Sequence, residues 1–229
     1  MGLLIAVANQ KGGVGKTTTT MNLAGAFTDA GYRTYVGDAD GQQSCMSWAA
    51  TTDPANPLPF AVGSVGKLGK NIGHAIARLA DEHDIVIVDC PPNVEDLTTG
   101  RVLAVADCTI VPTNSSPLDL WSGQGMVSLI EQTRTHNTRG KFAILRNRSK
   151  NKTLLHRQLS QLLDESGILL LKSTIADREV YAQSAALGRT VFDVRGLRPA
   201  KVAKDEMKTV YEEIVDLLNS DDEKEVVNG

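Results

Sequence analysis

The sequence predicts a single α/β domain in which a mostly parallel, twisted sheet carries helices on both faces. Two observations lead to this prediction. Short, continuous apolar runs recur along the 229 residues, as expected for strands that are buried on both faces. Segments with helical spacing lie between these runs, and strands that alternate with helices need crossover connections and therefore pair in parallel.

The apolar runs place the strands at 3–8, 34–38, 84–89, 108–113, 141–147 and 168–175. Helical spacing of apolar residues, as with Leu23, Phe27 and Ala30 on one face of the first segment, places helices at 16–30, 68–80, 94–106, 118–134, 153–165, 177–187 and 199–218. The proline-rich segment 51–63 is expected to be a long surface loop. We expect the domain to span 1–218 and residues 219–229 to form an acidic, flexible tail.

Composition favours a globular protein and excludes several classes. Apolar residues make up 41% and charged residues 22% of the chain, and the net charge is −3, so the whole molecule is not a polycation. No apolar run approaches the ~20 residues of a membrane span, and the N-terminus does not resemble a secretory signal. Three cysteines without metal-ligand spacing indicate a reducing compartment. These features predict a cytoplasmic protein.

The segment "NQKGGVGKTTTT" (9–20) contains the strongest functional signal. It follows the first predicted strand and opens a predicted helix, which is the context of a phosphate-binding P-loop. Gly12, Gly13 and Gly15 let the backbone turn its N–H groups inward, and the helix adds its positive end. Lys16 is expected to reach the β- and γ-phosphates and Thr17 to bind Mg²⁺. Gln10 stands where the strict motif has its first glycine, and the alternative is a glycine-rich turn without a ligand.

The departure from the strict motif resembles the deviant Walker A loop of the ParA/MinD family of ATPases. Three further segments are similar to family motifs: "VGDADGQQS" (36–44) to switch I, "IVIVDCPPN" (85–93) to Walker B and switch II, and "VPTNSSPLDL" (111–120) to the loop that holds the base. The resemblance covers roughly residues 2–217. It is greatest to the small plasmid-partition ParA proteins and their cargo-positioning relatives.

The resemblance implies that ATP and Mg²⁺ are the cofactors and that ATP holds together a homodimer. The front lysine, Lys11, would then cross the interface and contact the phosphates of the partner's nucleotide, so that Lys11, Lys16 and Asp40 form the catalytic set, with Asp40 positioning the attacking water. The expected nucleotide-binding residues are Lys11, Gly12, Gly13, Val14, Gly15, Lys16, Thr17, Thr18, Pro112, Asn114 and Asn147.

Acidic residues at strand ends point to the metal. Asp38 ends the second predicted strand and Asp89 the third, and parallel strands deliver both carboxylates to one edge of the sheet. Together with Thr17 they are the expected Mg²⁺ ligands, and strand-end turn or capping aspartates are the alternative. Near the base, Arg146 and Arg148 flank Asn147, and either arginine is a candidate to stack on adenine.

The C-terminal part of the chain suggests DNA as a partner. Lys201, Lys204 and Lys208 share one face of the last helix, opposite apolar residues that include Val202 and Met207. We expect sequence-independent phosphate contacts that ATP-driven dimerisation strengthens, made by Arg178, Arg189, Arg195, Arg198, Lys201, Lys204 and Lys208. The alternative is a solvated basic face.

By resemblance, the output is plasmid partition or the positioning of a large protein assembly on the nucleoid. A ParB-like or cargo-adaptor protein would stimulate a weak basal ATPase, binding near 94–106 and 118–134. The acidic C-terminal segment speaks against a MinD-like membrane helix. A P-loop metabolic enzyme, or an iron-protein-like enzyme that uses Cys90 or Cys108, remains the competing class.

Overall fold

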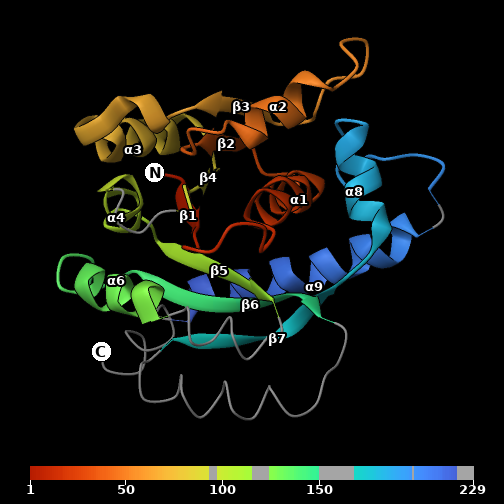
Figure 1. The fold of residues 1–229 in the computed structure, drawn as a ribbon. Coiled ribbons are helices and arrows are strands. Elements are labelled where there is room, and N and C mark those ends of the chain that lie inside the picture. The colour runs from red at the N-terminus through yellow and green to blue at the C-terminus, as the bar shows by residue number, and fades with distance from the viewer. Residues whose placement is uncertain (93–96, 115–123, 150–167, 198, 221–229) are drawn as a thin grey trace.

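The sheet has seven parallel strands in the order β3-β2-β4-β1-β5-β6-β7 (Figure 1). The computed structural model describes residues 1–92, 97–114, 124–149, 168–197 and 199–220. The strands are β1 (Leu3–Val7), β2 (Thr34–Asp38), β3 (Ala61–Ser64), β4 (Ile85–Asp89), β5 (Cys108–Asn114), β6 (Lys141–Ser149) and β7 (Leu169–Ala176).

Helices cover both faces of this sheet, and their bounds are α1 (Lys16–Asp29), α2 (Ser44–Ala50), the 3₁₀ helix η1 (Gly66–Asn71), α3 (Ile72–Glu82), α4 (Leu97–Leu103), α6 (Gln124–Arg134), α8 (Glu179–Ala186) and α9 (Ala200–Asn219). Alternate residues of the central strands point to opposite faces. Ile5 and Val7 of β1 belong to the core with α1, α2, α8 and α9, whereas Leu4 and Ala6 belong to the core with α3, α4 and α6.

The connection of the strands sets the position of the site. Strand β1 lies between β4 and β5, so the chain winds outward in opposite directions on the two sides of β1. Ligands of open α/β sheets bind outside the carboxyl ends of the strands at such a switch point. Val7, Asp38 and Asp89 end there in register, because Asp89 pairs with both of the other residues.

The predicted fold class is confirmed, with local corrections. Strand β3 falls mostly within the segment predicted as a loop, which makes the strand of Asp89 the fourth along the chain and not the third. Helix α2 was not predicted, and α3 begins only at Ile72, after η1. On α9, Val202 is 48% exposed, whereas Met207, Val210 and Ile214 are buried as expected. The predicted helix at 153–165 and nearly all of the predicted tail lie outside the described residues.

Candidate functional site

The loop between β1 and α1 has the backbone that its glycines predict. Gly13 and Gly15 have φ values of +74° and +90°, in the left-handed region that glycine adopts without cost. A Cβ at Gly15 would collide with the Asn147 amide nitrogen, whereas Gly12 and Gly13 have open space where a Cβ would stand. Val14, which lies between Gly13 and Gly15, is buried. The loop is therefore held tightly at Gly15 and is open at its front.

Three side chains hold the loop by its carbonyl oxygens. Lys16 Nζ donates to the Lys11 carbonyl at 3.3 Å. Asn147 Nδ2 donates to the Val14 carbonyl at 2.8 Å, and Arg148 donates to the Gly13 carbonyl at 3.2 Å. Both Asn147 and Arg148 lie near the end of β6, two strands from β1. The predicted loop residues and the predicted base-side asparagine are thus brought together.

The two lysines of the loop occupy different environments. Lys16 is only 8% exposed, and burial lowers its pKa while the nearby carboxylates of Asp89 and Asp40 act in the opposite direction. Lys11 is exposed at the front of the loop, and its backbone N–H donates to Asn9 Oδ1 at 2.9 Å. One lysine is therefore buried in the loop, and the other is exposed at its front.

Thr17 contacts Asp89 beside the loop, and Asp38 pairs with Asp89 on the neighbouring strand; all three are the residues expected to bind metal. The Thr17 hydroxyl donates to Asp89 Oδ2 at 2.7 Å. Asp89 is 1% exposed, burial raises its pKa to about 6, and its Oδ1 has no partner within the described part of the chain. A hydroxyl and a buried carboxylate with an unused oxygen fit Mg²⁺, which prefers oxygen ligands.

Asp38 is engaged differently from Asp89. Its two oxygens accept backbone hydrogen bonds, from Asp40 at 3.1 Å and from Met46 at 3.0 Å. Burial is the largest cause that raises its pKa. Asp38 therefore anchors the segment that carries Asp40 and the start of α2, in addition to being available to a metal through its remaining lone pairs. Asp40 is half-buried and accepts from the Gln42 backbone at 2.9 Å.

Sequence reasoning missed Cys45 as part of this site. The buried thiol of Cys45 donates to Asp89 Oδ2 at 3.3 Å, next to the Thr17 hydroxyl. Helix α2 brings Cys45 there, and no local motif marked this residue. Thr18, predicted to bind nucleotide, is half-buried, and its carbonyl accepts from Asn22 Nδ2.

The predicted base-side residues lie on neighbouring strands. Asn114 and Asn147 are paired across β5 and β6, and the Pro112 carbonyl accepts from Asn9 Nδ2 at 2.8 Å. Asn114 Oδ1 is buried and has no partner among the residues that the structure describes. Of the two flanking arginines, only Arg148 reaches the loop. Arg146 is buried and donates to the Lys172 carbonyl on β7.

The predicted DNA-binding residues differ in their exposure and in their ion pairs. Arg195 and Lys201 are exposed. Lys204 and Lys208 both pair with Asp29 at the end of α1, at 2.7 and 3.4 Å. Arg178 pairs with Glu206 at 2.7 Å, and Arg198 lies outside the described residues.

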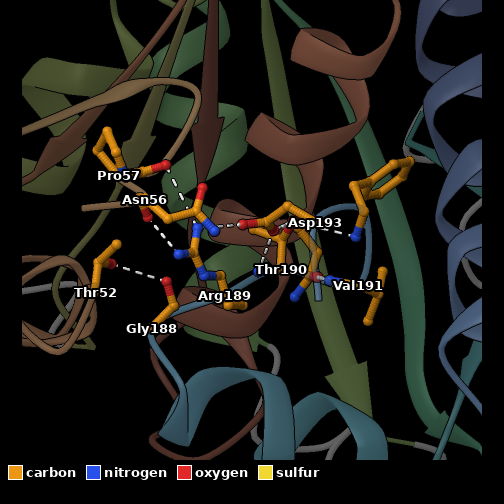
Figure 2. Close-up of polar contacts among 10 residues, drawn as sticks. Thr52, Asn56, Pro57, Gly188, Arg189, Thr190, Val191 and Asp193 are labelled. Atoms are coloured by element: carbon orange, nitrogen blue, oxygen red, sulfur yellow. Dashed lines mark hydrogen bonds and ion pairs between the residues drawn. The ribbon is translucent and has the colours of Figure 1, made fainter. Parts of the chain in front are cut away.

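Arg189 is buried, contrary to the expectation that it contacts DNA. Figure 2 shows its guanidinium between the carbonyls of Asn56 and Pro57 and the carboxylate of Asp193. The Asp193 carboxylate also accepts from the Thr190 backbone and hydroxyl. Arg189 therefore joins the loop after α2 to the turn that precedes α9, and it is not placed on an exposed face.

These features define a class. A parallel sheet with a glycine loop between β1 and α1, a buried lysine in that loop and a hydroxyl–carboxylate pair beside it constitutes a P-loop nucleotide-binding domain. Residues 5–223 match the family model described as the CobQ/CobB/MinD/ParA nucleotide binding domain, and the chain belongs to this family.

Individual proteins of known role are similar over almost the whole chain. Maintenance of carboxysome distribution protein A from Halothiobacillus neapolitanus is 29% identical, covering 92% of this chain and 95% of that protein. The chromosome-partitioning ATPase Soj from Thermus thermophilus is 30% identical, covering 82% and 86%. Among solved structures, the septum site-determining protein MinD from Pyrococcus horikoshii, complexed with Mg-ADP, shares the fold with a TM-score of 0.70, at 17% identity and covering 95% and 97%.

Proposed function

We propose that this protein is a Mg²⁺-dependent ATPase that dimerises when it binds ATP, associates with DNA without sequence preference and positions a cargo. The observation that carries the proposal is the placement of the two loop lysines, with Lys16 buried in the loop and Lys11 exposed at its front. One subunit can use Lys16 for its own nucleotide and present Lys11 to a second subunit.

The residues beside the loop divide the hydrolytic work. The inward N–H groups of the loop and Lys16 bind the phosphates, and Thr17 and Asp89 hold Mg²⁺. The metal, when bound, neutralises phosphate charge that develops during transfer. Asp40, on the segment that Asp38 anchors through a backbone hydrogen bond, orients the attacking water. Phosphoryl transfer depends mainly on such placement.

Lys11 makes the association of subunits depend on the nucleotide. A cation supplied by a second subunit binds strongly only while the γ-phosphate charge is present. ATP therefore favours the dimer, and hydrolysis followed by phosphate release weakens it. The basal rate should lie well below the ~10 s⁻¹ of a typical enzyme, so that a partner protein can control the lifetime of the dimer.

The proposed DNA surface consists of Arg195, Lys201, Lys204 and Lys208. These side chains lie on α9 and just before it; three of them are exposed, and Lys204 is half-buried. Arg189 is not part of this surface because it is buried. Contacts of this kind bind phosphates through counterion release, and a dimer presents the surface twice, which raises the effective affinity. Such binding would place the protein on the nucleoid.

The names of the relatives support a positioning role. One similar protein maintains carboxysome distribution and another partitions chromosomes, so a large protein assembly or a DNA molecule is the proposed cargo, linked through a ParB-like or adaptor protein that stimulates hydrolysis. No helix in the described part of the chain is long and apolar enough to cross a membrane. The iron-protein-like alternative has less support, because all three cysteines are buried, which does not suit a cluster shared between subunits.

A comparison of Lys11→Ala with Lys70→Ala tests the proposal. Lys70 is an exposed lysine of η1, far along the chain from the loop. We expect the wild-type protein and Lys70→Ala to double in mass with a slowly hydrolysed ATP analogue, as measured by light scattering after gel filtration. Lys11→Ala should remain a monomer while it still binds fluorescent ADP. A Lys11→Ala protein that dimerises with the analogue would refute the proposal.

DNA binding has its own measurement. Fluorescence anisotropy with labelled duplexes of two unrelated sequences should show binding with ATP, little binding with ADP, and a steep loss of affinity as salt rises. Equal affinity in the absence of nucleotide would remove the link between the ATP state and DNA.

A further inference from the structure

Arg148 has a backbone conformation that arginine rarely adopts. Among the described residues, Arg148 and Gln43 are the non-glycine residues with positive φ, at +49° and +54°. Both lie at the nucleotide site, one near the end of β6 and the other in the segment that follows Asp40. The left-handed region disfavours residues with a long side chain, and such residues are found at sites where the strain serves a function.

The pairing of β6 with β7 is irregular at the same place. Its register shifts between Arg146 and Ser149. Irregularities of this kind redirect a side chain at the edge of a site. Here the left-handed backbone brings the Arg148 guanidinium to the Gly13 carbonyl of the phosphate loop, at 3.2 Å.

This contact has a consequence for the next N–H group along the loop. In a planar trans peptide the C=O and the N–H of the same unit point in opposite directions. When Arg148 holds the Gly13 carbonyl on one side, the Val14 N–H is fixed on the other. Asn147 acts in the same way one residue later, because it holds the Val14 carbonyl and thereby fixes the Gly15 N–H. Two consecutive residues of β6 therefore orient two consecutive donors of the loop.

We propose that Arg148 is a positioning residue, which presets the Val14 N–H of the phosphate loop for a nucleoside diphosphate or triphosphate. This inference rests on nucleotide binding as part of the proposed function, and it adds a determinant outside the glycine motif. The backbone cost at residue 148 is present in the free protein. The benefit appears when an anion binds, because the donor is already in place and need not be ordered at that step.

The test separates positioning from a role in folding. Asparagine tolerates the left-handed region better than arginine but cannot reach the loop in the same way. Arg148→Asn should therefore weaken the binding of fluorescent ADP about fivefold, while the thermal midpoint of the nucleotide-free protein stays equal or rises. Arg148→Lys, which keeps a positive donor, should lie between Arg148→Asn and wild type. Arg139→Asn, the same change in an exposed residue before β6, should bind as wild type.

Several outcomes would overturn the inference: wild-type affinity in Arg148→Asn, a fall in the midpoint of the free protein that matches the loss of affinity, or equal losses in Arg148→Lys and Arg148→Asn. The use of ADP keeps the experiment independent of dimerisation. If the wild-type protein fails to dimerise with ATP, the proposed function fails, whereas the ratio of ADP affinities still decides the role of Arg148.

Discussion

The Thr17 hydroxyl donates a 2.7 Å hydrogen bond to Asp89 Oδ2, so the first turn of α1 and the end of β4 meet at one carboxylate. The Cys45 thiol donates to the same oxygen, which leaves Oδ1 of Asp89 as the atom without a partner in the described structure. A buried carboxylate with an unused oxygen is unfavourable for the free protein, because a buried charge needs compensation.

Asp89→Asn should make the nucleotide-free protein more stable at neutral pH. Burial raises the pKa of Asp89 from 3.8 to about 6, so its contribution to folding is most favourable below about pH 4 and is lost as the pH rises through 6. This rise in the pKa of Asp89 corresponds to about 3 kcal/mol of folding free energy that is lost once the carboxyl ionises. Urea unfolding should show the gain of Asp89→Asn above pH 6 and little gain near pH 4.

Asp81→Asn is the control for this prediction, because it removes a carboxylate that is exposed on α3 and so lacks the burial of Asp89. The Asp89→Asn protein should also lose most of the stabilisation that Mg-ADP gives to the wild type. If the stability difference between the wild-type protein and Asp89→Asn did not change with pH, the assignment of a charged, buried Asp89 would be contradicted.

Asp40→Ala should keep ATP-dependent dimers and lose turnover. In the proposed function the side chain orients water and does not hold the phosphates, so the rate of phosphate release should fall about a hundredfold or more, while the mass measured with ATP remains that of a dimer. Asp53→Ala, at an exposed aspartate beyond α2, serves as the control. Normal phosphate release from Asp40→Ala would refute the role of Asp40.

Asp29→Asn should strengthen DNA binding. Asp29 pairs with Lys204 and Lys208. Burial is the largest single influence on the pKa of Asp29 and raises it, but the two lysines together outweigh burial, so the pKa is lowered. If Lys204 and Lys208 bind DNA as proposed, DNA phosphates compete with Asp29 for the same two ammonium groups. Removal of the carboxylate should tighten binding about threefold in low salt, with a smaller gain in high salt.

The control for Asp29→Asn is again Asp81→Asn, which changes the net charge equally without touching the lysines. Equal affinities of the two variants for DNA would show that Asp29 does not compete. Loss of DNA binding in Asp29→Asn would show instead that the ion pairs hold the lysines in place for DNA.

Arg189→Ala should destabilise the protein by about 2–4 kcal/mol in urea unfolding. The change leaves the carbonyls of Asn56 and Pro57 and the Asp193 carboxylate without their donor. Arg189→Lys should recover only part of this loss, because a lysine cannot reproduce the planar fork of the guanidinium. An Arg189→Ala protein with unchanged stability and weakened DNA binding would contradict its burial.

The strands were predictable where their neighbours bury them. Strands β1, β4 and β5 are nearly continuous apolar runs because they lie in the middle of a doubly covered sheet. Strand β3 escaped prediction because it is an edge strand whose residues are half-buried or exposed, and it follows a proline-rich segment. Helix α2 is a single short helix of 7 residues, too brief for periodicity to reveal it.

The glycine loop between β1 and α1 was predictable because its sequence signal is local, and the structure places Lys16 and Thr17 at the start of α1 as expected. The basic surface was less predictable because spacing along a helix does not reveal long-range partners. Arg189 finds its acceptors at residues 56–57, and Arg178 finds Glu206. Arg148 also gave no signal of its contact with the loop, because its placement depends on an irregular strand pairing.

The burial of helix α1 has a consequence for its dynamics. The helix is buried along most of its length from Lys16 to Phe27, and Gly25 allows Thr190 to approach it so closely that a Cβ would have no room. The Asn22 side chain accepts a hydrogen bond from Val191 on the same side. A helix enclosed in this way has few routes to local unfolding. Its backbone amides should therefore be among the last in the molecule to exchange with deuterium, because they become accessible only when the whole fold opens.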